Sequence, residues 1–234
     1  MSLLAFGFVW AKQRGSTSDG AQKTRGFLVG KQRALNFYRI FSAVYDFVSP
    51  YLYTNTMRNE IVNQIKIGDD LRVLDVGCGT GYTTLGVLNR RDVSEVVGLD
   101  MNPLQLNKAV RNLHSKKARL SISRGDAENL PFIDDSFDAV ISVGAMENFP
   151  DPDRVLRELN RVANPNGNII VGGPESAWFS KFALNRIFYS PSVKEMERIF
   201  RNAGLVQVKS ALTGVNTFFG TGRYVVFTVG TKPA

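Results

Sequence analysis

The sequence predicts an α/β fold in which helices cover both faces of a mostly parallel, seven-stranded sheet. Short apolar runs rich in Val and Ile read as strands, and segments with apolar residues at helical spacing separate them. Strands that alternate with helices of this length favour a doubly wound parallel sheet. The five runs that carry this pattern are residues 72–76, 95–100, 120–126, 138–144 and 167–173. A helix over 192–202 and strands over 205–212 and 222–230 complete the expected elements.

Length and composition restrict the possible classes of protein. With 234 residues and 44% apolar content, the chain is long enough for one well-buried domain, which we place at residues 34–234. The single cysteine, Cys78, excludes an intrachain disulfide, and the single histidine, His114, excludes most histidine-based metal centres and triads. No metal site is therefore expected. A formal charge of +8 favours anionic partners such as nucleic acid, acidic lipid headgroups or an anionic ligand.

Residues 1–33 differ in composition from the rest. Residues 1–11 are almost wholly apolar and are followed by a basic, Gly/Ser-rich stretch. A span needs about 20 apolar residues, and a secretory signal carries its positive charge before the apolar run. Two interpretations remain: a tail or arm that packs on the domain, and an interfacial anchor that inserts Leu4, Phe6, Phe8 and Trp10 at the lipid boundary. Helices are expected next, over 34–48 and 53–66.

The stretch VLDVGCGTGYTT, residues 73–84, joins the first strand of this core to a helix. Gly77, Gly79 and Gly81 allow a tight turn and let a ligand lie against the backbone. A dinucleotide site favours G-x-G-x-x-G with a pyrophosphate at the helix N-terminus. Here Asp75 stands at the loop entrance, where it would repel a pyrophosphate and suit an ammonium group. The loop therefore indicates S-adenosylmethionine, and a nicotinamide-binding domain is the alternative.

Further acidic residues follow the next two strands. Asp100 ends the second strand, where a carboxylate can accept bonds from both hydroxyls of a ribose. Asp126, in GDAENLPF, is placed to accept from an adenine amino group. The remaining cofactor contacts expected in this core lie at or beside strand ends. They are Met101, Ala127 and Val143.

With these features the sequence resembles the class I S-adenosylmethionine-dependent methyltransferases, which have a Rossmann-like fold. Within them it is similar to the quinone-biosynthesis enzymes, most of all to the 2-methyl-6-phytyl-benzoquinol and solanesyl-benzoquinol methyltransferases. The likeness runs from about residue 36 to the C-terminus and depends on YRIFSAVYDFVSPYLYTNTMR, GTGYTTLG, MENFPDPDRVLRE and PESAWFSKFALNRIFYSPSVKEMERIFRNAGL. One departure is RVANPNGN, which stands where the family usually has a Leu-Lys-Pro-Gly-Gly turn.

The resemblance implies methylation of a ring carbon in a prenylated quinol of the benzoquinol type. A menaquinone- or ubiquinone-type quinol, or another small hydrophobic substrate, is the alternative. The resemblance also implies an N-terminal helical lid, with Tyr45 near the methionine part of the cofactor. Substrate contacts are implied for Tyr38, Asn148, Trp178 and Phe182, although an aromatic on an amphipathic helix is often a core residue. Trp178 and Phe182 belong to the aromatic segment over 178–189, WFSKFALNRIFY, which either completes the core or contacts an isoprenoid tail or the bilayer.

The candidate general base is Glu147, which follows the fourth strand in SVGAMENF. Its ordinary pKa of about 4.3 is far below that of a phenol, about 10, so burial would have to raise it. The alternative is that Glu147 only hydrogen-bonds a substrate hydroxyl or the loop backbone. His114 lies in RNLHSKK at the polar end of a helix and reads as a surface residue.

Two other classes of function fit the sequence less well. Amino-directed nucleic-acid methyltransferases usually carry an Asn/Asp-Pro-Pro-aromatic tetrad after the fourth strand, where this chain reads VGAMENFP, so no nucleic-acid partner is expected. A non-catalytic cofactor-binding subunit is disfavoured by Asp75, Asp100 and Asp126. We expect a cytoplasmic protein with peripheral membrane contact, which also accounts for the basic charge. The sequence gives no indication of the oligomeric state.

Overall fold

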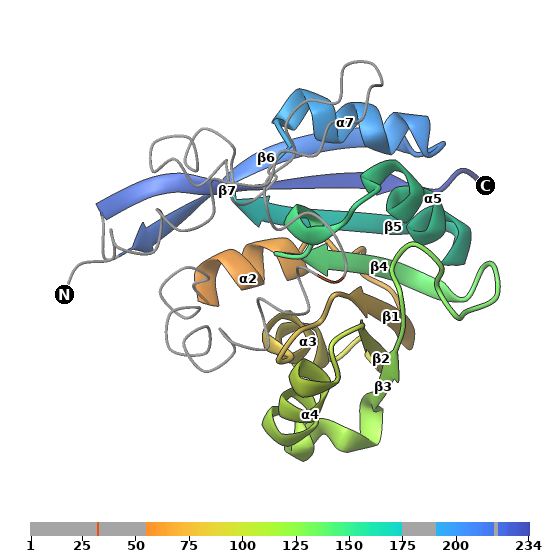
Figure 1. Cartoon of the computed structure of the whole chain (residues 1–234), viewed down its shortest axis with the longest axis vertical. Coiled ribbons are helices and arrows are strands. Elements are labelled where there is room, and N and C mark those ends of the chain that lie inside the picture. Colours follow the sequence, from red (N-terminus) through yellow and green to blue (C-terminus); the bar gives the residue numbers. More distant parts are fainter. Residues whose placement is uncertain (1–31, 33–54, 175–190, 218–219) are drawn as a thin grey trace, which may run out of the picture.

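The computed structural model describes residue 32 and residues 55–174, 191–217 and 220–234. Seven strands form one sheet in the order β3-β2-β1-β4-β5-β7-β6 (Figure 1). The strands are β1 (Leu71–Val76), β2 (Val93–Asp100), β3 (Leu120–Arg124), β4 (Phe137–Val143), β5 (Ala163–Pro174), β6 (Val206–Thr217) and β7 (Gly220–Thr231). The first five pair in parallel, and β7 runs antiparallel to both β5 and β6. The predicted seven-stranded, mostly parallel sheet is confirmed.

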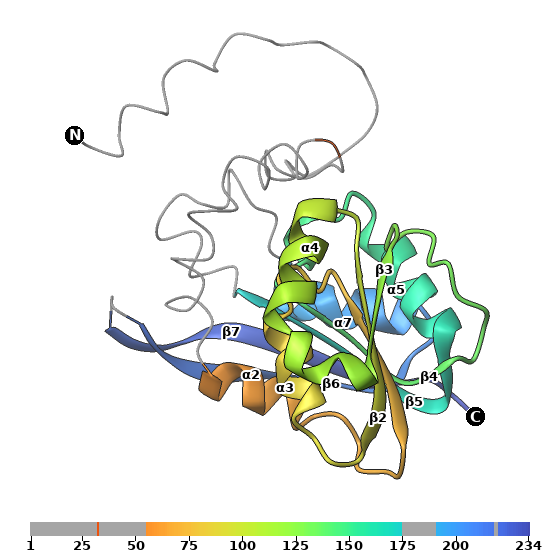
Figure 2. The same ribbon diagram turned by 90° about the horizontal axis from the view of Figure 1, so that it is seen from below.

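Helices lie on both faces of the sheet (Figure 2). They are α2 (Asn55–Val62), α3 (Tyr82–Leu88), α4 (Pro103–Asn112), α5 (Pro152–Val162) and α7 (Val193–Asn202), with 3₁₀ turns η2 (His114–Arg119) and η3 (Met146–Asn148). One core cluster joins α5 and α7 to the sheet through residues such as Leu156 and Phe200, which are fully buried. A second cluster on the other face joins α2 and α3 through Ile61 and Leu88. The sheet is therefore the middle layer of three.

Local sequence explains where several helices begin. Asn102 caps α4 by accepting a hydrogen bond from the Leu104 amide, and Pro103 occupies the first turn. Asp151 caps α5 in the same way, with the Arg154 amide as donor and Pro152 behind it. A capping side chain satisfies an amide that has no partner within the helix, and proline loses nothing at the first helical position. The Asp/Asn-Pro pairs therefore fix the two points at which the chain turns back along the sheet.

Boundaries differ from the sequence prediction at the C-terminal strands. β6 and β7 run further than predicted and pair with each other as far as Thr217 and Gly220. The departure at RVANPNGN covers the end of α5 and the start of β5, where the pairing of β4 with β5 shifts register between Phe137 and Ala139. Asn166 adopts a φ of +63° there, in the left-handed region that asparagine tolerates.

Several predicted features lie outside the described residues. These are the tail over 1–33 apart from Gln32, the helix over 34–48 with its lid role, and the aromatic segment over 178–189. Among the helices that are described, none has both the length and the apolar character required to cross a bilayer.

Candidate active site

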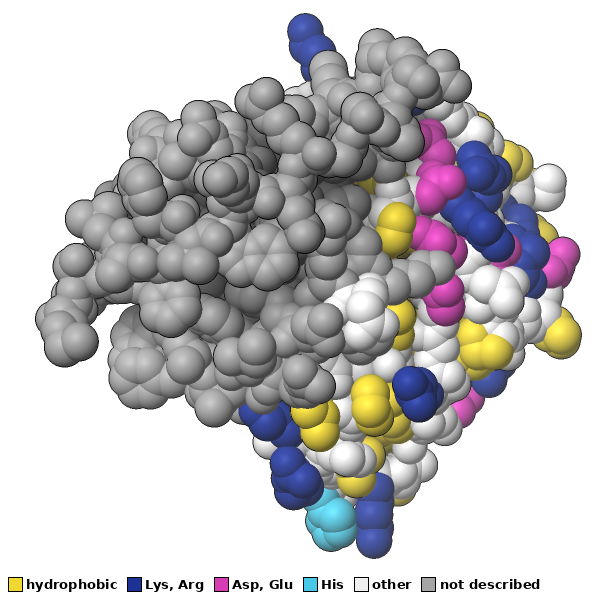
Figure 3. Space-filling model, in the orientation of Figure 1, with side chains coloured by type: hydrophobic (Ala, Val, Ile, Leu, Met, Phe, Trp, Pro, Cys, Tyr) yellow, Lys and Arg dark blue, Asp and Glu magenta, His cyan; other side chains and the backbone are white. Residues whose placement is uncertain are grey.

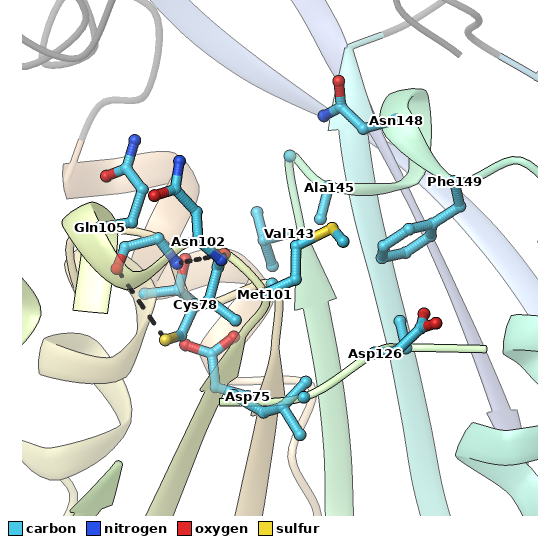
Figure 4. Close-up of a pocket in the computed structure, with 18 of the residues that line it drawn as sticks. Asp75, Cys78, Met101, Asn102, Gln105, Asp126, Val143, Ala145, Asn148 and Phe149 are labelled. Atoms are coloured by element: carbon cyan, nitrogen blue, oxygen red, sulfur yellow. Dashed lines mark hydrogen bonds between the residues drawn. The ribbon is translucent and has the colours of Figure 1, made fainter. Parts of the chain in front are cut away.

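A large cavity opens at the carboxyl ends of β1, β2 and β4 (Figure 4). Eight of the predicted cofactor residues line it: Asp75, Gly77, Gly79, Asp100, Met101, Asp126, Ala127 and Val143. Asp75 lies at its base, with Asn102 and Gln105 on one side and Asp126 and Phe149 on the other. The predicted juxtaposition of these residues is therefore present in the structure.

The glycines of the loop have different roles. Gly77 has a φ of +74°, and a Cβ there would lie 2.5 Å from the Ala145 Cβ, so a side chain would clash with the loop after β4. Gly81 has a φ of +89° and precedes α3; a Cβ there would lie 2.6 Å from Leu113. Gly81 does not line the cavity. Its position serves the turn into α3 and the packing against Leu113, and its role as a cofactor contact stays a prediction.

Asp100 connects the end of β2 to the glycine loop. Its Oδ2 accepts a hydrogen bond from the Gly79 amide at 3.0 Å, and its Oδ1 accepts one from the Asn102 amide at 2.8 Å. Burial raises the pKa of Asp100, and these backbone bonds oppose the rise. The carboxylate is thus fixed in orientation, with lone pairs remaining for a ligand in the cavity.

Asp75 is nearly inaccessible, with 1% of its surface exposed. Its Oδ2 accepts a hydrogen bond of 2.6 Å from the Thr84 hydroxyl. Burial raises the pKa of Asp75 to about 7, the Thr84 bond opposes this rise, and the negative charge of Asp100 adds to it. A cation bound beside this carboxyl would favour its ionised form.

Asp126 lies in the turn after β3. Its Oδ1 accepts a hydrogen bond from the Glu128 amide at 3.0 Å, and its carbonyl accepts one from the Asn129 amide at the same distance. These bonds hold the turn, so Asp126 faces the cavity from a fixed backbone. No Lys, Arg or His occurs among the described residues that line the cavity, whereas three Asp and one Glu do.

Some lining residues were missed by sequence reasoning. Asn102 and Gln105 come from the first turn of α4, and Cys78 comes from the loop. Gln105 is buried, and its Oε1 has no hydrogen-bond partner within the described part of the chain, so it can accept from a ligand. Burial raises the pKa of the Cys78 thiol, which makes it a poor nucleophile. In the sequence, the Asn-Pro pair that follows Met101 could have indicated Asn102 as a site residue.

Glu147 does not line the large cavity. It lies on η3 with 5% of its surface exposed and lines a second, small cavity with residues of β5, β7 and α7. Neither carboxyl oxygen has a hydrogen-bond partner among the described residues. Burial raises its pKa to about 7. The next residue, Asn148, faces the large cavity.

The other predicted site residues fall into two groups. His114 is exposed at the start of η2, as predicted, and the single histidine of the chain is visible on the surface beside Lys and Arg side chains (Figure 3). Tyr38, Tyr45, Trp178 and Phe182 lie outside the described residues. Within the described ranges, no group of three or more His, Cys, Asp and Glu side chains is arranged to hold a metal ion.

Comparison with known families agrees with this geometry. Residues 74–171 match the family described as "Methyltransferase domain". This match begins in β1, ends in β5 and contains the glycine loop, Asp75, Asp100 and Asp126. Residues 74–171 are therefore similar to a methyltransferase domain.

Individual relatives are more specific. The chain is 38% identical over 202 residues to the chloroplastic 2-methyl-6-phytyl-1,4-hydroquinone methyltransferase 2 of Oryza sativa subsp. japonica, an alignment that covers 85% of this chain and 58% of that protein. It thus spans about three fifths of that relative's length. It is also 33% identical over 118 residues to the demethylmenaquinone methyltransferase of Lactobacillus johnsonii, covering 49% of this chain and 48% of that one.

Among solved structures, the fold is similar to that of phosphoethanolamine N-methyltransferase 2 of Haemonchus contortus in complex with phosphomonomethylethanolamine and S-adenosylhomocysteine. The TM-score is 0.70 at 17% identity, over 88% of this chain and 61% of that one. At this identity the likeness concerns the fold alone. It confirms the predicted Rossmann-like class I methyltransferase fold.

Proposed function

We propose that the protein is an S-adenosylmethionine-dependent C-methyltransferase that methylates the aromatic ring of a prenylated benzoquinol. The observation that carries the proposal is the chemistry of the large cavity, which presents carboxylates and no cationic side chain among its described lining residues. A pyrophosphate would be repelled by such a lining, which disfavours a nicotinamide dinucleotide. A ligand that has an ammonium, a ribose and an adenine but no phosphate fits it.

Each carboxylate has a distinct partner in this proposal. Asp75 pairs with the ammonium of the methionine part, because a cation offsets the cost of ionising a carboxyl buried to this extent. Asp100 accepts from the ribose hydroxyls and Asp126 accepts from the adenine amino group. Met101, Ala127 and Val143 supply apolar surface beside them. When it is bound, S-adenosylmethionine supplies an electrophilic methyl group carried on its sulfonium.

Glu147 is proposed as the general base. It accepts the proton of a ring hydroxyl, which makes the ortho carbon nucleophilic towards the methyl group. Methyl transfer to that carbon would leave S-adenosylhomocysteine, a thioether. The methylated carbon would then lose its proton while the ring oxygen regains one from Glu147, so that one proton is released overall. A carboxyl with a pKa of about 7 is better matched to a phenol than an ordinary glutamate is.

The rest of the chain contributes alignment and exclusion of water. The positive charge of the sulfonium and the negative charge of the phenolate disappear together, which a dry, low-dielectric site favours. The apolar walls of the small cavity, formed by Val171, Val226 and two methionines, suit this requirement. Positioning the two carbons for in-line transfer is then the main task of the protein.

The second candidate is a naphthoquinol of the menaquinone type, favoured by the similarity to the Lactobacillus johnsonii enzyme. In both cases the substrate is a membrane lipid, so we propose peripheral membrane contact through residues 1–33 and the aromatic segment over 178–189. A cytoplasmic location and the absence of a nucleic-acid partner are parts of the same proposal. The rice relative, whose name places it in the chloroplast, is similar over most of this chain.

The test is a radiolabelled methyl-transfer assay with prenylated benzoquinols and naphthoquinols, followed by mass analysis of the products. We expect transfer to benzoquinols, with the label on a ring carbon. Transfer only to naphthoquinols would select the second candidate. A protein that binds S-adenosylmethionine but labels no quinol would contradict the proposal.

A further inference from the structure

We infer that the small cavity around Glu147 is a subsite that binds a ring hydroxyl of the substrate, with Thr228 as a second hydrogen-bonding group and Gly173 as the residue that leaves the carboxyl free. This inference rests on the proposed function and specifies where in the fold the quinol ring is held. The described residues that line the subsite are Met146, Glu147, Val171, Gly172, Gly173, Pro191, Met196, Val226 and Thr228.

The first argument is the unmet hydrogen-bonding capacity of Glu147. Both of its carboxyl oxygens are buried, and neither has a partner in the described part of the chain. A buried polar group without a partner is costly, and native proteins rarely keep one unless it serves a ligand. Among the described lining residues, Glu147 is the sole ionisable group, so none of them supplies a cation to pair with it.

The second argument concerns Thr228. Its side chain is fully buried, and its hydroxyl shares one hydrogen bond of 2.9 Å with the hydroxyl of Ser210 on β6. If Ser210 is the donor, the Thr228 hydroxyl is left to donate into the cavity. A phenolic oxygen can then donate to Glu147 and accept from Thr228. An aliphatic or aromatic hydroxyl meets both requirements, whereas an ether can only accept.

The third argument is the apolar character of the other walls. Met146 and Met196 are both buried and line the cavity from η3 and α7. Thioethers make favourable contacts with aromatic rings and adapt to irregular shapes. An aromatic ring that carries a hydroxyl therefore matches this lining better than a sugar or an amino acid does.

The fourth argument is the position of the subsite relative to the large cavity. Consecutive residues of η3 face different cavities, because Glu147 lines the small one and Asn148 lines the large one. A ring held by its hydroxyl at Glu147 can thus present the adjacent carbon towards the cofactor side of η3. This carbon is the one that the proposed reaction methylates.

The absence of a side chain at Gly173 leaves room for the Glu147 carboxyl in this position. A Cβ at Gly173 would lie 2.9 Å from Oε1 of Glu147. The φ of Gly173 is not positive, so the backbone itself does not require glycine. The clash involves the flexible end of a side chain, and Gly173→Ala should therefore displace the carboxyl without unfolding the protein. Gly173 is accordingly a positioning residue.

The test measures binding as well as turnover. The probes are a methylhydroquinone with a short prenyl chain and its dimethyl ether, each titrated into the full chain saturated with S-adenosylhomocysteine. We expect the wild-type protein to bind the quinol about tenfold or more tightly than the ether, and Glu147→Leu to reduce this ratio to about one. Gly173→Ala, which retains the carboxyl, should lower the ratio partly. Affinity for S-adenosylhomocysteine should stay unchanged in both variants.

Controls separate the possible failures. Glu60→Gln changes an exposed glutamate on α2 and should preserve the ratio. Glu147→Leu should fold at least as well as wild type, because an unpartnered buried carboxyl is removed; if it does not fold, Gly173→Ala decides. An unchanged quinol-to-ether ratio in the folded variants would overturn the subsite even if wild-type methyl transfer to quinols is observed. Lack of transfer by the wild type would instead contradict the proposed function.

Discussion

The Thr84 hydroxyl donates a hydrogen bond of 2.6 Å to Oδ2 of Asp75 at the base of the large cavity. This distance is typical of a charge-assisted bond to a carboxylate. The bond favours the ionised form of Asp75, yet burial outweighs it and raises the pKa to about 7. Near neutral pH, the carboxyl is therefore close to the midpoint of its titration before any ligand binds.

Cofactor affinity should depend on pH through Asp75. The pKa in the free protein is raised above its ordinary value of 3.8, and a cationic ligand would lower it again. Binding then requires the ionised form, so affinity is full above pH 7 and falls about tenfold per pH unit below it. Calorimetry with S-adenosylmethionine between pH 5.5 and 8.5, in buffers of different ionisation enthalpy, should show proton release that grows as the pH falls.

Asp75→Asn is the matched control for this dependence. The Thr84 hydroxyl can still donate to the amide oxygen, so the local structure should be retained. Affinity should be weaker and nearly independent of pH. A pH profile identical to that of the wild type would assign the titration to a different group.

Asp100 provides a second test of the cofactor assignment. Asp100→Asn keeps one oxygen, which can accept from only one of the Gly79 and Asn102 amides, and it loses the charge. Affinity for S-adenosylmethionine should fall by about 1.5–3 kcal/mol, the value of a hydrogen bond to a charged group. Calorimetry on protein with an unchanged melting curve gives the measurement. Equal affinity in the variant would remove Asp100 from the site, and tight NADH binding by the wild type would contradict the cofactor itself.

The acidic residues could be predicted because their positions depend on short stretches of sequence. Asp75 and Asp100 lie at the ends of β1 and β2, Asp126 follows β3, and parallel strands bring their carboxyl ends to one edge of the sheet. Strand recognition was therefore sufficient to bring them together. The even spacing of Gly77, Gly79 and Gly81 does not distinguish their individual roles. Only the packing of Leu113 against Gly81 reveals its structural role.

The orientation of Glu147 could not be predicted in the same way. One residue along a 3₁₀ turn changes the direction of a side chain by about a third of a turn, so Glu147 and Asn148 face different cavities. Which of the two cavities each side chain faces depends on contacts with β5, β7 and α7, elements that are distant in sequence. Gln105 was missed for a related reason, since the face that the first turn of α4 presents is set by its packing on the sheet.

The role of Glu147 as a base can be separated from a role in positioning by kinetics. Glu147→Gln should lower kcat by about 10²-fold while cofactor affinity is nearly unchanged, because the amide cannot accept the phenol proton. The deficit should shrink as the pH approaches about 10, where the phenol is already ionised. Rates of single turnover from pH 6 to 10 measure this. A deficit that is flat across the range would indicate that Glu147 positions the ring and does not take its proton.

Membrane contact is the remaining prediction, and it rests on the sequence. A prenylated quinol is held in a bilayer, so an enzyme that uses it must reach the membrane surface. The apolar run over 1–11 is too short to span, and it is followed by Lys12, Arg14, Lys23 and Arg25. Each basic residue near an anionic surface contributes about 1 kcal/mol, and salt screens this part. Full-length protein should therefore sediment with anionic vesicles at low salt and less so at high salt.

Deletion of residues 1–33 should weaken this binding and slow turnover of long-tailed quinols presented in vesicles. Turnover of a short-tailed quinol in solution should be unaffected, because the described residues that line the large cavity and the Glu147 subsite all follow position 70, and the predicted contacts Tyr38 and Tyr45 also lie outside the deleted segment. The short-tailed substrate thus serves as the internal control for folding and chemistry. If neither protein sediments with lipid at either salt concentration, the chain does not use these residues to reach the membrane. Equal turnover of both substrates by the two proteins would lead to the same conclusion.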